Sequence, residues 1–120
     1  MKIMQELVDT AAERRRKRPP AAQAIMDDAT AALAASGIED QVLKAGDRAP
    51  SFALPDALGN AVALADLLAQ GPVVISFYRG GWCPYCNLEL RALEQQLDEI
   101  EAAGASLAAI SPQTPDNSLS

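Results

Sequence analysis

The two cysteines of this 120-residue chain, Cys83 and Cys86, are separated by two residues. They directly follow an apolar run, Val73–Tyr78, and directly precede a helix-like pattern. A Cys-x-x-Cys pair at a strand-to-helix turn is suited to reversible thiol–disulfide chemistry. No third cysteine competes for either sulfur.

The neighbours of the cysteines predict which thiol is activated. Pro84 suits the first position of a helix, so Cys83 should lie at or near the N-cap, where free N–H groups and the helix dipole favour a thiolate. Arg79 is the only nearby cation and adds to this effect, and Gly80-Gly81 permits a tight turn. Cys86 lies one turn inside the helix on its apolar stripe. We therefore expect an exposed, activated Cys83 thiol and a more sheltered Cys86 within bridging distance.

Two other interpretations of the pair stay open. Both residues could be ordinary buried cysteines, and the place of Cys86 on the apolar stripe fits that interpretation. A metal site is less favoured, because the chain has no histidine and two thiolates leave a tetrahedral zinc half-coordinated unless two chains share it. We expect neither a metal nor a cofactor.

Composition and charge narrow the class of protein. The chain is 49% hydrophobic with a net charge of −6, and its acidic groups lie mainly after residue 18, which argues against nucleic acid as a partner. The basic run Arg14–Arg18 is interpreted as a solvated helix end, with contact to an anionic surface as the alternative. Neither a signal peptide nor a membrane-spanning stretch is indicated, so no membrane partner and a cytoplasmic location are expected.

The elements that must position the cysteines divide the chain into an N-terminal helical arm, residues 1–42, and a body, residues 43–120. Pro19-Pro20 should break the arm into two helices, and Gly37 should end the second. The second helix has a small apolar stripe of Ala21, Ile25, Ala29 and Leu33. Because the arm is too small for a core of its own, we expect it to pack on the body or on a second subunit.

The body should begin with short strands and end with a β-α-β unit. A turn at Asp56–Asn60 predicts a hairpin that leads to a short helix near residues 65–69. A strand over Val73–Tyr78, apolar enough to be buried on both faces, should be followed by one helix that ends at Gly104 and a parallel strand over 105–110. The helix stripe is Cys86, Leu90, Leu93, Leu97 and Ile100.

Two parallel strands and one helix do not make a covered sheet. We therefore expect this chain to be the front part of a longer fold, or to complete its sheet by pairing with a second copy. A homodimer could form through the arm or through an exposed sheet edge.

Four segments together resemble peroxiredoxins of the alkyl hydroperoxide reductase/thiol-specific antioxidant group: Gly46–Asp56, Gly59–Leu64, Val73–Tyr78 and Arg79–Cys86. The resemblance covers residues 43 to 112. It implies an α/β, thioredoxin-like (peroxiredoxin-type) fold with a β-α-β core, a short N-terminal β-hairpin and a helical arm, in which the C-terminal half is missing.

The resemblance also assigns roles to the cysteine segment. The family motif Pro-x-x-x-Thr-x-x-Cys lays its peroxidatic cysteine on Cys86, its threonine on Cys83 and its proline on Arg79. Trp82-Cys83-Pro84-Tyr85-Cys86 is instead similar to thioredoxins, in which the first cysteine attacks. The two likenesses disagree about the nucleophile; for peroxide reduction the family motif favours Cys86, with Cys83 closing a disulfide. Trp82, Pro84 and Arg79 are expected to support the site.

Three functions follow from these observations. The first is a thiol peroxidase that reduces hydroperoxides and is recycled by thioredoxin or another dithiol. The second is a thiol/disulfide oxidoreductase that acts on protein disulfides. The third is an inactive, truncated interaction module.

Overall fold

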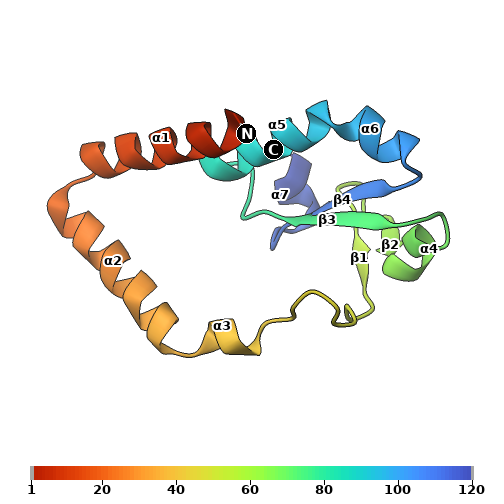
Figure 1. Cartoon of the computed structure of the whole chain (residues 1–120), viewed down its shortest axis with the longest axis horizontal. Helices are drawn as coiled ribbons and strands as arrows, with labels where there is room; N and C mark the ends of the chain where they lie inside the picture. The colour runs from red at the N-terminus through yellow and green to blue at the C-terminus, as the bar shows by residue number, and fades with distance from the viewer. Residues whose placement is uncertain (1, 120) are drawn as a thin grey trace. The chain divides into compact units, whose positions relative to one another are not determined.

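A computed structural model describes residues 2–119 of the chain. It divides into two compact units, Val8–Pro50 and Met1–Leu7 with Ser51–Ser120, which are treated separately below. Figure 1 shows the order of the elements along the chain. The sequence-based division at residue 42 stays a prediction, because a compact unit is not by itself a test of independent folding.

The arm is helical as predicted, and proline and glycine set its breaks. Helix α1 (Lys2–Lys17) ends before Pro19, and helix α2 (Pro20–Ala35) begins with a proline at its first turn. Pro20 fits there because the first N–H of a helix has no partner within the helix. Gly37 follows with a left-handed φ of 76° and separates α2 from the short helix α3 (Ile38–Gln41). The predicted Pro19-Pro20 break and Gly37 stop are both confirmed.

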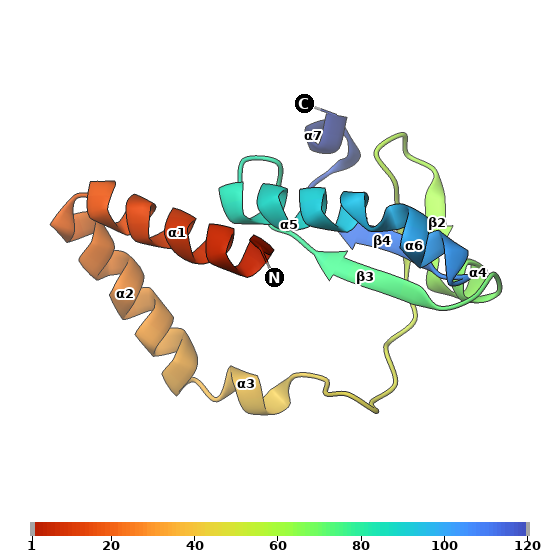
Figure 2. The same cartoon turned by 45° about the horizontal axis from the view of Figure 1, so that its top comes forward.

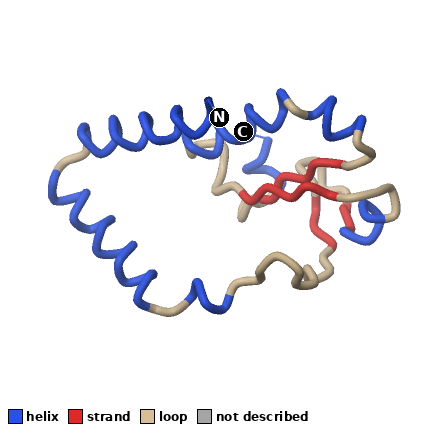
Figure 3. The backbone as a smooth tube through the Cα atoms, in the orientation of Figure 1, coloured by secondary structure: helices blue, strands red, loops and turns tan. Residues whose placement is uncertain are grey.

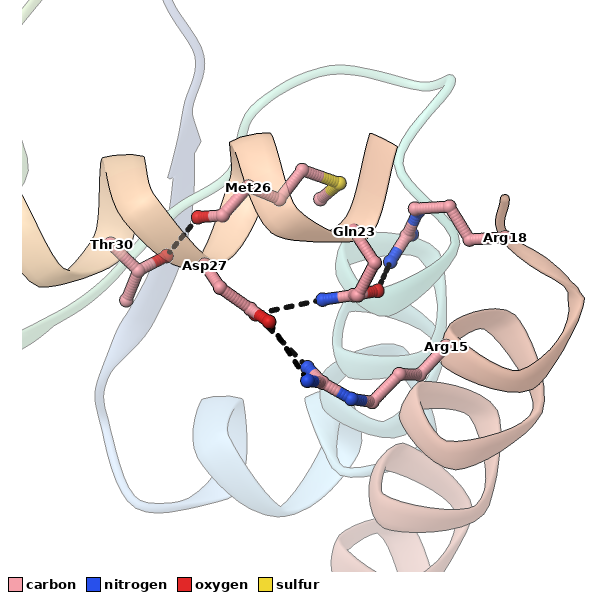
Figure 4. A network of polar contacts seen from close by, with 6 residues as sticks. All are labelled: Arg15, Arg18, Gln23, Met26, Asp27 and Thr30. Carbon is pink, nitrogen blue, oxygen red and sulfur yellow. Dashed lines mark hydrogen bonds and ion pairs between the residues drawn. The ribbon is translucent and has the colours of Figure 1, made fainter. Parts of the chain in front are cut away.

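Polar contacts join the end of α1 to the start of α2 (Figure 4). The Arg15 guanidinium donates two hydrogen bonds to the Asp27 carboxylate, at 3.0 and 2.9 Å. Gln23 links Asp27 to a second arginine, because its amide donates to Asp27 at 2.8 Å and accepts from Arg18 at 2.6 Å. These hydrogen bonds lower the pKa of the Asp27 carboxyl, and the bonds from Arg15 have the largest effect. The basic helix end is thus exposed, as interpreted from the sequence, but partly paired.

Helices α1 and α2 bury no residue. Ile25 is 71% exposed and Leu33 56% exposed, so the apolar stripe predicted for the second helix is uncovered. Contacts between side chains on a helix surface contribute only a few tenths of a kcal/mol each, about 0.2–0.5. The arm therefore has no core of its own, as its composition predicted.

The second unit opens with the predicted hairpin. Strands β1 (Ala53–Pro55) and β2 (Ala61–Ala63) pair antiparallel, and helix α4 (Leu64–Leu68) follows directly. Asp56 shapes the turn between the strands, because its carboxylate accepts the N–H groups of Leu58 and Asn60, both at 2.9 Å. Such a local acceptor is the reason that Asp favours turns.

A β-α-β unit carries the cysteines. Strand β3 (Val73–Phe77) pairs parallel with strand β4 (Ser106–Ile110), from Val73 opposite Ser106 to Phe77 opposite Ile110. Helices α5 (Pro84–Gln95) and α6 (Leu97–Ala102) lie along this strand pair (Figures 1 and 2). Figure 3 shows that the strands lie in the second unit, whereas the arm consists of helices joined by short loops. The predicted parallel crossover is confirmed.

The crossover is two helices, whereas the sequence predicted one. At Gln96 the backbone leaves helical geometry (φ −101°, ψ 2°), and its N–H bonds to the Leu93 carbonyl three residues back. This tighter turn interrupts the helix without a proline or glycine, so composition did not reveal it. Gly104 ends α6 as predicted: its φ is +81°, its N–H bonds to Glu101 at 2.9 Å, and the N–H of Ala105 bonds to Ile100 at 3.1 Å.

Strand β3 is not buried on both faces, which corrects the prediction from its apolar run. Ser76 is buried and donates a hydrogen bond to Glu89 of α5 at 3.2 Å. The next residue, Phe77, is 75% exposed, and Val74 is 39% exposed. Within the described residues β3 pairs only with β4, so one of its edges and part of its surface are open.

Very few side chains are buried in the described part of the chain. Leu64 and Cys83 are the buried apolar residues, and Ser76 is the buried polar one. A short helix, α7 (Pro115–Leu119), follows β4. Among residues 2–119 no helix is both long enough and apolar enough to cross a bilayer.

Candidate active site

Cys83 is the N-cap residue of α5, as predicted. Its backbone is extended (φ −87°, ψ 111°), and Pro84 occupies the first turn. The Cys83 sulfur accepts the backbone N–H of Cys86 at 3.4 Å, and the Cys83 carbonyl accepts the N–H of Asn87 at 3.0 Å. A helix start leaves its first N–H groups without partners, and here the sulfur takes one of them.

The turn before the helix is fixed by its own backbone. The N–H of Cys83 bonds to the Gly80 carbonyl at 3.0 Å, and the Asn87 side chain donates to the Gly81 carbonyl at 2.8 Å. A Cβ atom on Gly80 would collide with the indole ring of Trp82. Glycine is therefore required at position 80 for the ring to lie against the turn.

Arg79 contacts both sulfurs. Its guanidinium lies 3.5 Å from the Cys83 sulfur, and its backbone N–H lies 3.4 Å from the Cys86 sulfur. The same guanidinium stacks over the Trp82 ring, with its central carbon 4.8 Å from the ring centroid, which is cation–π distance. Four of the five predicted site residues, Arg79, Trp82, Cys83 and Cys86, are thus connected by direct contacts, and Pro84 holds the helix start.

The sulfur of Cys83 is set up to carry negative charge near neutral pH. Burial raises the pKa of a thiol, and this is the largest single effect on Cys83. The hydrogen bonds from the Cys86 thiol and the Cys86 backbone N–H, together with the Arg79 guanidinium, outweigh it and lower the pKa of Cys83 to about 7. The predicted activation of Cys83 has a structural cause in these three donors.

The exposures of the two thiols are opposite to those expected from the sequence. Cys83 is 1% exposed, whereas Cys86 is only partly buried. An N-cap side chain folds back over the first turn of its helix to reach the N–H groups, and here that movement carries the sulfur inward beneath Arg79. The activated thiol is therefore the sheltered one, and its partner is the more accessible one.

Sequence reasoning missed two further side chains. Asn87 clamps the cysteine turn through Gly81, and Ser111 lies within 3.4 Å of the Arg79 carbonyl from the segment after β4. Asn87 directly follows Cys86, but an asparagine in a helix carries no signal of such a contact. Ser111 is 32 residues from Arg79, and only the parallel strand register brings them together.

Both cysteines are free thiols in this structure. Among the described residues no group of three or more histidine, cysteine, aspartate or glutamate side chains could hold a metal ion. The arrangement itself places two free thiols side by side, which supports thiol–disulfide chemistry.

Comparison with known proteins shows the family and the fold of the chain. A model of the AhpC/TSA family matches residues 45–120, and the chain belongs to that family. It is 39% identical over 74 residues to Peroxiredoxin Bcp of Escherichia coli (strain K12), an alignment that covers 62% of this chain and 47% of the relative. The chain thus spans about half the length of the curated relatives it matches.

A solved structure shares the same fold. The crystal structure of Peroxidoxin BcpB from Mycobacterium tuberculosis superposes with a TM-score of 0.61 at 32% identity, covering 64% of this chain and 50% of that one. The β-α-β unit with its preceding hairpin is therefore a thioredoxin-like fold of the peroxiredoxin type, as the sequence resemblance implied.

Proposed function

We propose that this chain acts as a thiol-dependent peroxidase, which reduces hydrogen peroxide or an organic hydroperoxide through Cys86 and Cys83. The observation that carries the proposal is the pairing of an accessible thiol with a neighbouring sulfur whose pKa lies near 7. Family membership and the peroxiredoxin names of the relatives support the same chemistry.

In the first step the peroxide meets Cys86, because Cys83 is closed to solvent. Cys83 accepts the proton of the hydrogen-bonded Cys86 thiol. The Cys86 thiolate then attacks one peroxide oxygen, and the O–O bond breaks. Cys86 becomes a sulfenic acid, and the leaving alkoxide takes the proton back from Cys83 and departs as the alcohol, or as water when the substrate is hydrogen peroxide.

In the second step the Cys83 thiolate attacks the sulfur of the Cys86 sulfenic acid. The S–S bond forms, the S–O bond breaks, and the hydroxide released takes a proton from solvent. A thiol whose pKa is close to the ambient pH is the best nucleophile for such a step, because it is ionised and still reactive. The pKa of Cys83 fits this resolving role.

The disulfide must then be reduced by an external dithiol. We propose thioredoxin or a similar dithiol protein, which attacks the bridge, passes through a mixed disulfide and leaves oxidised. A cytoplasmic location fits this cycle, because the reducing compartment keeps both thiols available between turnovers.

The experiment that tests the assignment compares Cys83→Ser with Cys86→Ser after limiting peroxide. Cys83→Ser should retain a sulfenic acid on Cys86 that mass spectrometry detects after trapping. Cys86→Ser should form none at a comparable rate. Sulfenic acid in the Cys86→Ser protein alone would reverse the roles, and none in either variant would refute peroxidase activity.

A second function is favoured by one observation, the exposed Trp82. This ring is 67% exposed beside the activated Cys83, as a surface for a protein substrate requires. A thiol/disulfide oxidoreductase would use Cys83 as the attacking thiol and would reduce insulin disulfides quickly while reacting slowly with peroxide. Fast peroxide consumption with slow insulin reduction supports the peroxidase instead.

A further inference from the structure

The cysteine turn is tied to the segment that follows β4. The Tyr78 N–H bonds to the Ile110 carbonyl at 2.9 Å, which extends the β3–β4 ladder one residue beyond the strands. At the next position a side chain takes over, because the Ser111 hydroxyl lies 3.4 Å from the Arg79 carbonyl. The backbone of Arg79 is therefore held from a second element of the fold.

Ser111 has a second polar neighbour. Its hydroxyl is 3.0 Å from the side-chain amide of Gln113. A hydroxyl carries a single proton, so it can donate to only one of these two acceptors. In the structure the Gln113 Oε1 faces the hydroxyl and accepts from it. The oxygen and nitrogen of an amide occupy interchangeable positions, and with the amide turned by about 180° its NH₂ donates to Ser111 and Ser111 donates to the Arg79 carbonyl.

Arg79 in turn acts on both thiols. Its guanidinium reaches the Cys83 sulfur, and its N–H reaches the Cys86 sulfur. The long side chain has many rotamers, and holding its backbone restricts the directions in which it leaves the turn. A hydroxyl in the segment after β4 is thus coupled to the electrostatics of the thiol pair.

We propose that Ser111, supported by Gln113, is a positioning residue that holds Arg79 on the two sulfurs and so sets the ionisation of Cys83. The inference rests on the proposed function for its biological meaning, although the effect on thiol ionisation does not require it. Ser111 itself touches neither sulfur in the described contacts.

The test measures the pH profile of alkylation by iodoacetamide, resolved for Cys83 and Cys86 by mass spectrometry of the reduced chain. In Ser111→Ala the midpoint for Cys83 should move to higher pH, and the alkylation rate of Cys83 at about pH 6.5 should fall by about threefold. Ser111→Thr keeps the hydroxyl and should restore the midpoint. The midpoint reports ionisation of the sulfur, and its recovery in Ser111→Thr assigns the shift to the loss of the hydroxyl.

Two controls separate positioning from other effects. Ser106→Ala makes the same chemical change at the other end of β4, where the hydroxyl is buried without a partner among the described residues, and should leave the profile unchanged. Arg79→Gln should raise the Cys83 midpoint by itself, and adding Ser111→Ala to it should cause no further shift, because the two residues act in series.

An unchanged midpoint in Ser111→Ala overturns the proposal, as does an equal shift in the Arg79→Gln background. If Ser111→Ala does not fold, Gln113→Leu decides: an upward shift supports the network, and no shift overturns it. If Ser111→Ala shifts the Cys83 midpoint as expected but the wild-type chain does not react with peroxide, the proposed function is refuted and this inference stands.

Discussion

At Cys83 two opposite effects act on one sulfur atom. Burial disfavours the thiolate, while the Cys86 thiol, a backbone N–H and the Arg79 guanidinium favour it. The donors win because they are aimed at the sulfur, and a hydrogen bond to a charged group is about twice as strong as one to a neutral group. Cys86 is only partly buried, and the hydrogen bond that its sulfur accepts comes from the Arg79 backbone N–H, so the two thiols are suited to different steps.

The lowered pKa of Cys83 predicts a pH-dependent stability of the reduced protein. Between the folded pKa of about 7 and the ordinary thiol value of 9.0, the unfolded chain binds more protons, so stability rises with pH. The contribution should be complete above about pH 9 and lost as the pH falls through about 7. Denaturant unfolding of the wild-type chain and of Cys83→Ser checks this; equal pH slopes for the two proteins would contradict it.

Gly80 and Gly81 provide a matched test of the turn. Alanine at position 80 would place its Cβ against the Trp82 indole, whereas a Cβ at position 81 meets no atom within 4 Å. Gly80→Ala should therefore displace Trp82 from Arg79 and raise the Cys83 alkylation midpoint, with a shift in tryptophan emission. Trp82 is the single tryptophan, so the emission reports on this site alone. Similar spectra and midpoints for Gly80→Ala and Gly81→Ala would count against the account.

At the residue scale, the sequence predicted the groups that surround the Cys83 sulfur, but it did not predict that this sulfur is buried. The Cys83 N-cap, Pro84 in the first turn and the proximity of Arg79 all depend on neighbours in the sequence, so local rules reached them. The burial of Cys83 depends on how its side chain folds back over the helix start and on where the Arg79 side chain lies in space. Ser111 directly follows β4, 32 residues from Arg79, and no local rule could bring it there.

At the scale of elements, the β-α-β unit places the thiols by joining a strand end to a helix start. At the opposite end of the two strands, the turns that precede β3 and β4 lie close together. There Gly71 approaches Gly104 so closely that a Cβ on Gly71 would collide with the Gly104 carbonyl oxygen. Both glycines have positive φ, 140° and 81°, and neither turn tolerates a side chain without strain.

Gly71→Ala should destabilise the chain more than Gly59→Ala does. Both positions have positive φ, but only Gly71 has backbone in the path of the new methyl group. We expect a loss of about 1 kcal/mol for Gly59→Ala from the backbone conformation alone, and about 2–4 kcal/mol for Gly71→Ala from conformation plus overlap. Equal losses measured by denaturant unfolding would show that the strand ends are not packed this closely.

Most elements could be predicted because their signals are local. Pro19-Pro20, Gly37, the Asp56 turn and Gly104 each act through their own backbone geometry. The break at Gln96 could not, because no residue type marks it. The apolar run of β3 predicted burial on both faces, but apolar composition states only that a strand can be covered, and Phe77 is 75% exposed.

At the scale of the whole molecule, the chain matches about half the length of its curated relatives and shows an open strand beside the candidate site. An edge strand with exposed apolar side chains is a template for pairing with another chain. The sequence predicted this open sheet, because two parallel strands and one crossover helix are too few elements to cover both faces of a sheet.

We expect concentration-dependent self-association through β3. Phe77→Asp should shift the chain toward monomer in sedimentation velocity, because it places a charge on the open strand. Leu58→Asp is the matched control, since Leu58 is 78% exposed and Phe77 75%, and Leu58 lies in the hairpin turn away from β3. Identical behaviour of the two variants, or a monomer at all concentrations for wild type, would contradict pairing through β3.

The most direct test of the central claim is the intact mass of the reduced chain after one equivalent of hydrogen peroxide. We predict rapid loss of two hydrogens, which marks a bridge between Cys83 and Cys86, and no such loss in either single serine variant. A wild-type chain that keeps both thiols, or that gains oxygen without closing the bridge, would contradict the claim that these two sulfurs work as a peroxide-reducing pair.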